Sequence, residues 1–281
     1  MRKLALILLF LLFAAVALFA AYNIITTLRD YQEGEEMYES MQSFIVVPTA
    51  APTAAPEPAE QPMASPAAAP EEAPAEVPAA TPTPVPAPAP TPDDTVWPIV
   101  DFDALLAQSQ DVVCWIYSEG TKINYPVAQG PDNDYYIHKL PDGRYNGAGT
   151  IFMDYRNHPD FSDRHTILYG HHMNNGSMFA SISRYKRQDY YDQHPVMLIL
   201  TPDGNFKLEI FAGYVAALSD PAWKLNFESD EAFEAWIRES IARSTFSCDV
   251  VPTAEDQIVT LSTCSYEFKD ARYVLLGVLR K

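Results

Sequence analysis

The second part of this sequence predicts a mainly β domain, a barrel or sandwich of eight short strands with a few peripheral helices. From Thr95 to Lys281 the chain is rich in Val, Ile, Leu, Phe, Tyr and Trp. These residues fall in short runs, and Gly, Pro, Asn and Asp, which favour turns, separate the runs. A stretch of this length can bury one sizeable core. We therefore expect a single folded domain at residues 99–281.

The eight strands are expected where β-branched and aromatic residues cluster. They are residues 113–117, 123–127, 148–153, 166–169, 196–201, 206–217, 258–263 and 273–280. The sequence Pro-Asp-Gly-Asn at 202–205 predicts a hairpin turn between the fifth and sixth strands. In an all-β fold of this kind, strand ends and loops carry the chemistry.

Three helices are expected between the strands, at residues 101–108, 176–185 and 230–243. The third has the clearest pattern, with Ser229 as its N-cap. Its apolar side chains recur at helical spacing on one face, at Phe233, Trp236, Ile237 and Ile241. We interpret this stripe as core packing against the sheet.

The N-terminus predicts a membrane anchor within residues 1–26. Residues 4–22 are apolar and uncharged, Arg2 and Lys3 precede them and acidic residues follow. A run of this length nearly spans a bilayer, and the charges place the N-terminus in the cytoplasm and the rest of the chain outside the cell. The alternative is a signal peptide cleaved near Ala20-Ala21. The apolar regions of signal peptides are only about 7–15 residues long, which favours a single-pass anchor in the cell membrane.

Two segments separate the anchor from the predicted domain. Residues 27–47 form an acidic juxtamembrane segment, and residues 48–98 contain 16 of the 24 prolines. The second segment predicts an extracytoplasmic linker of polyproline II character, which would reach on the order of 150 Å. An SH3-type ligand is the alternative for a Pro-rich tract, but a spacer fits an extracellular location better.

Charge excludes one class of partner. The net charge is −18, and the sequence has no clusters of Lys and Arg of the kind that bind phosphates. We therefore expect no nucleic-acid partner. Much of the acid lies in residues 27–98, where it keeps the chain solvated.

The odd number of cysteines leaves at least one thiol without a disulfide partner. Cys114 lies in an apolar run and is most simply a buried hydrophobe, and Cys248 has no evident role. Cys264 closes the strand at 258–263, where polar residues begin. A thiolate there would be a nucleophile if a base or a cation lay nearby, whereas the alternative is a structural cysteine.

His171 and Arg272 are the candidate partners of Cys264. His171 follows a strand that ends at Gly170, and Arg272 opens the strand after Cys264. The guanidinium would stabilise an oxyanion, although a surface cation is the simpler interpretation of Arg272 alone. The pair His171-His172 predicts no metal site, because adjacent extended residues point in opposite directions and no further ligand lies at the required spacing. The remaining histidines are expected in surface loops, at His138, His158, His165 and His194.

Together these motifs resemble the Cys-His-Arg site of the sortases, most closely class B. The resemblance covers residues 100–281 and rests on Thr-Leu-Ser-Thr-Cys (260–264), Tyr-Gly-His-His-Met-Asn-Asn-Gly-Ser-Met-Phe (169–179), Gly-Thr-Ile-Phe-Met-Asp-Tyr-Arg-Asn (149–157) and Asp-Asn-Asp-Tyr-Tyr (132–136). The long helix before the cysteine strand also matches class B. The resemblance implies an eight-stranded sortase-type β-barrel.

The resemblance also implies a mechanism. Cys264 would attack the carbonyl of a Thr in the sorting motif of a secreted protein, His171 would be the general acid and base, and Arg272 would stabilise the oxyanion. The acceptor would be an amine of a cell-wall precursor, of a cross-bridge or of a pilin. No metal or organic cofactor is implied. The residues that would line the substrate groove are Ser262, Tyr169, Asn133, Ile137 and Trp223.

Two other functions remain open at this point. A cysteine peptidase that releases surface proteins by hydrolysis would use the same thioester and differ only in its acceptor. An inactive surface interaction domain would keep the fold without the reaction.

Overall fold

The computed structural model describes residues 2–48 and 95–281, so most of the predicted linker, residues 49–94, lies outside the described residues. The helical elements are α1 (Arg2–Gln42), α2 (Phe102–Gln108), η1 (Tyr135–His138), η2 (Ala180–Lys186), α3 (Gln188–Gln193), η3 (Pro221–Trp223) and α4 (Asp230–Ala242). The strands are β1 (Ile45–Val46), β2 (Ile99–Val100), β3 (Val112–Tyr117), β4 (Asn124–Gln129), β5 (Ile151–Met153), β6 (His165–Tyr169), β7 (Val196–Thr201), β8 (Gly204–Ala216), β9 (Ile258–Cys264) and β10 (Arg272–Arg280).

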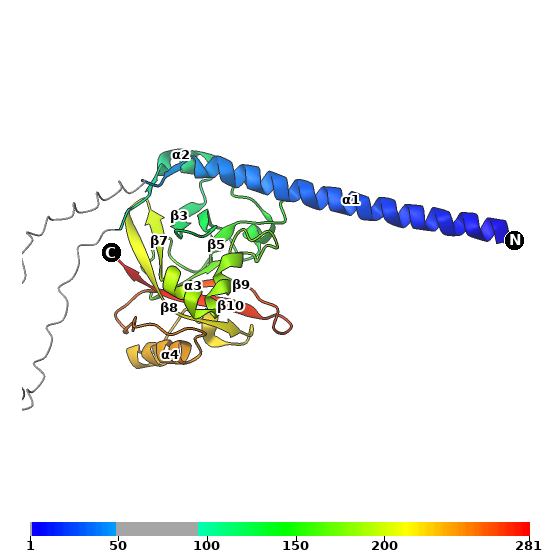
Figure 1. The fold of residues 1–281 in the computed structure, drawn as a ribbon. Coiled ribbons are helices and arrows are strands. Elements are labelled where there is room, and N and C mark those ends of the chain that lie inside the picture. Colours follow the sequence, from blue (N-terminus) through cyan, green and yellow to red (C-terminus); the bar gives the residue numbers. More distant parts are fainter. Residues whose placement is uncertain (1, 49–94) are drawn as a thin grey trace, which may run out of the picture. The chain divides into compact units, whose positions relative to one another are not determined.

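Strands β3 to β10 close into an eight-stranded barrel, which confirms the predicted fold class (Figure 1). Their order around the barrel is β10-β8-β7-β3-β4-β5-β6-β9. Most neighbours are antiparallel, but β4 pairs with β5 and β6 pairs with β9 in parallel. Because parallel strands end at the same edge of a sheet, the carboxyl ends of β6 and β9 lie side by side.

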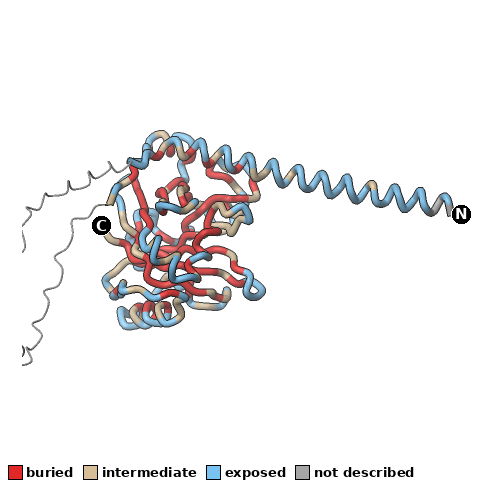
Figure 2. Tube along the Cα trace, in the orientation of Figure 1, coloured by how far each residue is buried: buried red, intermediate tan, exposed pale blue. Residues whose placement is uncertain are grey.

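Apolar side chains fill two layers of the fold. One buried cluster fills the barrel and includes Ile116, Val127, Ile199, Leu261 and Leu275. The buried path of these strands through the domain is drawn in red in Figure 2. Each such side chain contributes about 1.5–3 kcal/mol when it is removed from water. The strands are therefore held mainly by apolar burial.

A second cluster lies between α4 and the outer face of the barrel. Phe233, Trp236 and Ile237 of α4 are buried, and they pack with residues of β8 and β10. The Ser229 hydroxyl accepts a hydrogen bond from the Ala232 amide at 3.2 Å and caps the helix. The predicted helix, its N-cap and its apolar stripe are thus confirmed.

Local backbone geometry explains two differences from the predicted elements. The strand expected at 148–153 is shortened to β5 because Gly149 has a φ of +59° and turns the chain. The helix expected at 176–185 begins only at Ala180, as a 3-10 helix, because Gly176 (+80°) and Met178 (+55°) have left-handed φ values. Such values are incompatible with a continuous right-handed helix.

Helix α1 is longer than the predicted anchor. Its large apolar side chains from Leu6 to Leu28 are exposed, and by length and composition it is able to cross a membrane. The last turns differ, because Tyr38 and Met41 are buried. Figure 2 shows this change along α1, from exposed at its N-terminal end to partly buried near the barrel.

Hydrogen bonds join the end of α1 to the barrel domain. The Tyr38 hydroxyl donates to the Gly149 carbonyl at 2.5 Å, and the Asn146 side chain donates to the Asp30 carbonyl at 2.7 Å. Beyond the helix, β1 pairs with β2 in antiparallel fashion, with Ile45 opposite Val100. The acidic composition of residues 27–47 gave no indication of these contacts.

His165 is buried in the structure, so its predicted place in a surface loop was wrong. It lies on β6, where its Nδ1–H donates to the Lys224 carbonyl at 2.8 Å and its Nε2 accepts from the Thr260 hydroxyl at 2.8 Å. Burial lowers the pKa of His165 to about 4. The imidazole is therefore neutral at neutral pH, and it ties the segment after η3 to the sheet.

This burial predicts a pH-dependent stability. Between pH 6.5 and pH 4 the unfolded chain binds a proton at His165 and the folded chain does not, so the free energy of unfolding falls as the pH falls. The loss should reach about 3 kcal/mol, because each unit of pKa difference corresponds to about 1.36 kcal/mol. Denaturant unfolding at pH 7 and at pH 4.5 measures this loss, and the free energy of unfolding should fall less between the two pH values in His165→Asn than in the unchanged protein. An equal loss in both proteins would contradict the assignment.

Candidate active site

The β9–β10 pair places Cys264 beside Arg272. Cys264 is the last residue of β9, Arg272 is the first residue of β10, and the two are directly opposite in the antiparallel register. Directly opposite residues project from the same face of a sheet. Both side chains are only partly buried, which leaves them accessible at one end of the barrel.

The β6–β9 pair brings His171 to the same end. Tyr169 lies opposite Ser262, the Gly170 amide donates to the Ser262 carbonyl at 3.1 Å, and the Thr263 hydroxyl donates to the Gly170 carbonyl at 2.7 Å. Gly170 is required here, since a Cβ would lie 2.7 Å from the ring of Phe179. The chain therefore leaves β6 close to β9, and His171 follows directly.

The surroundings of His171 fix its tautomer and lower its pKa. Its Nε2–H donates to the Ile137 carbonyl at 2.7 Å, so Nδ1 of the neutral ring is free to accept a proton. Burial lowers the pKa of His171, and the hydrogen bond to Ile137 opposes that effect. His138, stacked at 5.6 Å between ring centroids, and the charge of Arg272 lower the pKa further. The imidazole is therefore a neutral base at neutral pH.

A cavity of about 430 Å³ collects the residues predicted for the site. It is lined by Asn133, Ile137, Tyr169, His171, Trp223, Ser262, Cys264 and Arg272, so all eight predicted residues meet there. Trp223 donates from its indole to the Ser262 hydroxyl at 3.4 Å, which places the ring over one wall. The sequence did not indicate four further lining residues, which are Phe152, Gly170, Leu218 and Thr263.

The two adjacent histidines have different partners. His172 donates from Nδ1 to the Cys264 carbonyl at 3.2 Å, whereas His171 contacts Ile137. His172 thus holds the backbone of the cysteine, a role that its sequence position did not reveal. Within residues 2–48 and 95–281, no group of three His, Cys, Asp or Glu side chains is arranged to hold a metal ion.

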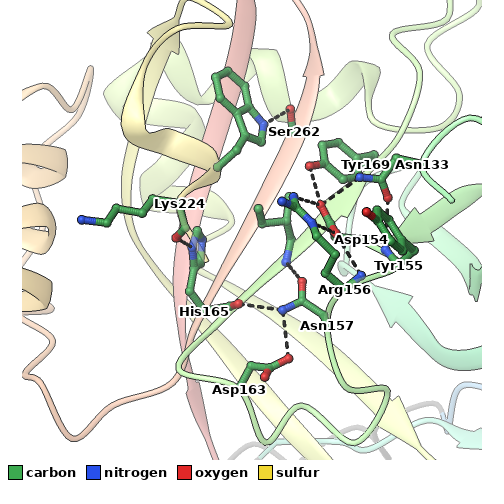
Figure 3. Close-up of polar contacts among 12 residues, drawn as sticks. Asn133, Asp154, Tyr155, Arg156, Asn157, Asp163, His165, Tyr169, Lys224 and Ser262 are labelled. Atoms are coloured by element: carbon green, nitrogen blue, oxygen red, sulfur yellow. Dashed lines mark hydrogen bonds and ion pairs between the residues drawn. The ribbon is translucent and has the colours of Figure 1, made fainter. Parts of the chain in front are cut away.

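A buried carboxylate supports one wall of the cavity (Figure 3). The Asp154 side chain is fully buried, and its Oδ2 accepts from the Asn133 amide at 2.9 Å and from the Tyr169 hydroxyl at 3.0 Å. Arg156 donates to both carboxylate oxygens, at 2.8 and 2.7 Å. Burial alone would raise the pKa of Asp154, but hydrogen bonds from Arg156, Asn133 and Tyr169 outweigh it and lower the pKa. Asp154 therefore remains ionised and orients two lining residues.

Asp154 was not assigned a role from the sequence, although it lies within a motif that was noted there. The residue lies in the motif at 149–157, which contributed to the resemblance as a whole. Its function depends on contacts with Asn133 and Tyr169, which are 21 and 15 residues away. Such contacts are visible only in the folded chain.

Comparison with known proteins agrees with this geometry. Residues 116–280 match the sortase domain family. The chain is 33% identical over 182 residues to sortase B of Staphylococcus aureus, and this alignment covers 64% of this chain and 75% of the relative. It is 36% identical over 173 residues to sortase B of Listeria monocytogenes, with 61% and 70% covered. The solved S. aureus sortase B–substrate complex is 32% identical, with a TM-score of 0.61, and covers 64% of this chain and 84% of that structure.

The barrel, the cavity and these similarities define a cysteine transpeptidase of the sortase type. The chain belongs to the sortase family, and within it to the sortase B group.

The environment of His171 predicts its titration. NMR titration of the protein should give a midpoint below 6.5 for His171, because burial disfavours the imidazolium. His158 is an internal control, since its hydrogen bond with Asp163 raises its pKa above 6.5. A His171 midpoint at or above that of His158 would contradict this buried environment.

The Asp154 network predicts a defect in peptide binding. Asp154→Asn should lower kcat/KM for a peptide substrate about tenfold, mostly through KM, because Asn133 and Tyr169 lose a charged acceptor worth about 1.5–3 kcal/mol. Asp142→Asn is the matched control, since it removes an ion pair with the exposed Arg144. Steady-state kinetics would contradict the positioning role if both variants behaved alike.

Proposed function

We propose that this protein cleaves a sorting motif of secreted proteins after a Thr residue and transfers the new C-terminus to an amine of the cell wall or of a pilin. The observation that carries the proposal is the meeting of Cys264, Arg272 and His171 at one end of the barrel, in a single peptide-sized cavity. One solved S. aureus sortase B is a substrate complex, and another solved sortase B is complexed with triglycine. These complexes support a peptide donor and an amine acceptor.

The chemistry follows from the properties of the three side chains. The Cys264 thiol gives its proton to Nδ1 of His171, and the thiolate attacks the Thr carbonyl. Arg272 donates to the oxygen that becomes negatively charged. His171 returns the proton to the departing amine, which leaves a thioacyl bond on Cys264. The incoming amine then attacks the thioacyl carbon, the bond to Cys264 breaks, and His171 takes a proton from the amine and passes it to the departing thiolate.

The lining residues supply a groove for the donor peptide. Ile137 and Trp223 offer apolar contact, and Ser262, Tyr169 and Asn133 offer hydrogen bonds. Asp154 fixes the last two of these, so part of the groove is formed before the peptide arrives. A preorganised groove lowers the entropy cost of binding.

The proposed location is the outer face of the cell membrane. Helix α1 exposes large apolar side chains from Leu6 to Leu28, and basic residues precede them. A single-pass anchor with a cytoplasmic N-terminus accounts for both features. The barrel would then meet secreted donors as they emerge.

The decisive experiment separates transfer from hydrolysis. A soluble form should begin at Thr27, because Tyr38 and Met41 belong to the buried core. Incubation with peptides that carry sorting motifs should give an adduct with triglycine. Hydrolysis without an adduct would support the peptidase alternative, and an inert protein would support the interaction-domain alternative.

Substitutions should separate the roles of the residues. Cys264→Ala should abolish cleavage, and Arg272→Ala should lower kcat by about 10²–10³, because one oxyanion donor is lost. Cys248→Ala is the matched control and should retain activity, since Cys248 donates to the Phe211 carbonyl and lies outside the cavity lining. Mass spectrometry of the products is the measurement. An active Cys264→Ala protein would exclude the proposed nucleophile.

A further inference from the structure

We propose that residues 30–46 are a structural part of the barrel domain, and that the Pro-rich segment leaves and re-enters this domain instead of spacing it from the membrane. The inference rests on the anchor topology proposed above. It changes the expected role of residues 48–98, because a segment that begins and ends on the same domain adds nothing to the distance between the membrane and the active site.

The contacts of α1 carry the first step. Tyr38 is 6% exposed and Met41 is fully buried. The Tyr38 ring meets Tyr125 of β4 edge to face at 5.1 Å between centroids, and its hydroxyl donates to the Gly149 carbonyl. Gln42 donates to the Asn124 carbonyl at 3.0 Å. The helix that enters from the membrane is thus already packed on the barrel before the Pro-rich segment begins.

The β1–β2 pair carries the second step. Ile45 lies opposite Val100 and Val46 opposite Ile99, and the Asp101 amide donates to the Phe44 carbonyl at 2.8 Å. The two ends of the Pro-rich segment are therefore held side by side. Residues 30–46 accordingly belong to one unit with residues 99–281, and Figure 1 shows the C-terminal part of α1 beside the barrel while its N-terminal part projects away.

The consequence for reach is large. From Ile25, near the end of the predicted anchor at residues 1–26, to the hydrogen bond of Asp30 with Asn146 there are five helical residues, or about 8 Å at 1.5 Å per residue. An extended Pro-rich spacer would allow a distance on the order of 150 Å between the membrane and the barrel. Helix α1 would therefore hold the active site near the membrane surface, and donor and acceptor would have to reach the enzyme there.

Site-specific proteolysis of the full chain in vesicles tests this topology. The recognition sequence of a site-specific protease replaces residues within 70–76, the protein is reconstituted in phosphatidylcholine vesicles, and the vesicles are sedimented after cleavage. If residues 30–46 are part of the domain, the cleaved barrel remains in the pellet. If the segment is a spacer, cleavage releases the barrel into the supernatant, and that result would overturn the proposal.

Two variants make the result specific. The same recognition sequence inserted between Leu28 and Arg29 should release the barrel, because that cut precedes the hydrogen bond at Asp30 and the buried residues Tyr38 and Met41. Tyr38→Ala combined with the site at 70–76 should increase release several-fold, because it removes the buried ring and its hydrogen bond. Retention that Tyr38→Ala leaves unchanged would contradict the proposed contact. The readout is sedimentation, so failure of the proposed reaction would leave this test intact.

Discussion

The parallel pairing of β6 with β9 is the constraint on which the candidate active site depends. Most of the barrel is antiparallel, and antiparallel neighbours end at opposite edges. Only because β6 and β9 run in the same direction do Gly170 and Cys264 lie at one edge. The antiparallel partner β10 then begins at that edge and supplies Arg272. Three chemically different side chains meet there because each is adjacent to the end or the start of a strand.

Buried polar groups behind this edge hold the cavity in shape. Asp154 accepts hydrogen bonds from Asn133 and Tyr169, and His165 donates to the carbonyl of Lys224, the residue after Trp223. An unpaired buried carboxylate or imidazole would destabilise the fold, but each of these groups has hydrogen-bond partners. Figure 3 shows Asp154 with Asn133 and Tyr169, and His165 with Lys224. The cost of burying them is offset by their bonds, and the result is a groove whose polar groups are oriented in advance.

The sequence predicted the features that depend on local patterns. The strands, the α4 helix with Ser229 as its cap, and the positions of Cys264, His171 and Arg272 at strand ends follow from residue periodicity and turn residues. Gly176 and Met178 have left-handed φ values, and these interrupt a helix that the sequence predicted. The φ values depend on tertiary context, which a local pattern does not show. The burial of His165 and the contacts of Asp154 depend on residues far away along the chain, and no local pattern encodes them.

The same limit explains why the N-terminal region differed most from expectation. Acidic composition predicts a solvated segment, yet a helix needs only one apolar stripe to pack on a neighbour. Tyr38 and Met41 lie three residues apart and share one face of α1, while the acidic side chains around them remain exposed. Tyr38 donates to Gly149, and a Cβ at Gly149 would lie 2.2 Å from the Ile137 carbonyl that accepts a hydrogen bond from His171. Gly149 therefore links the segment that orients the imidazole to helix α1.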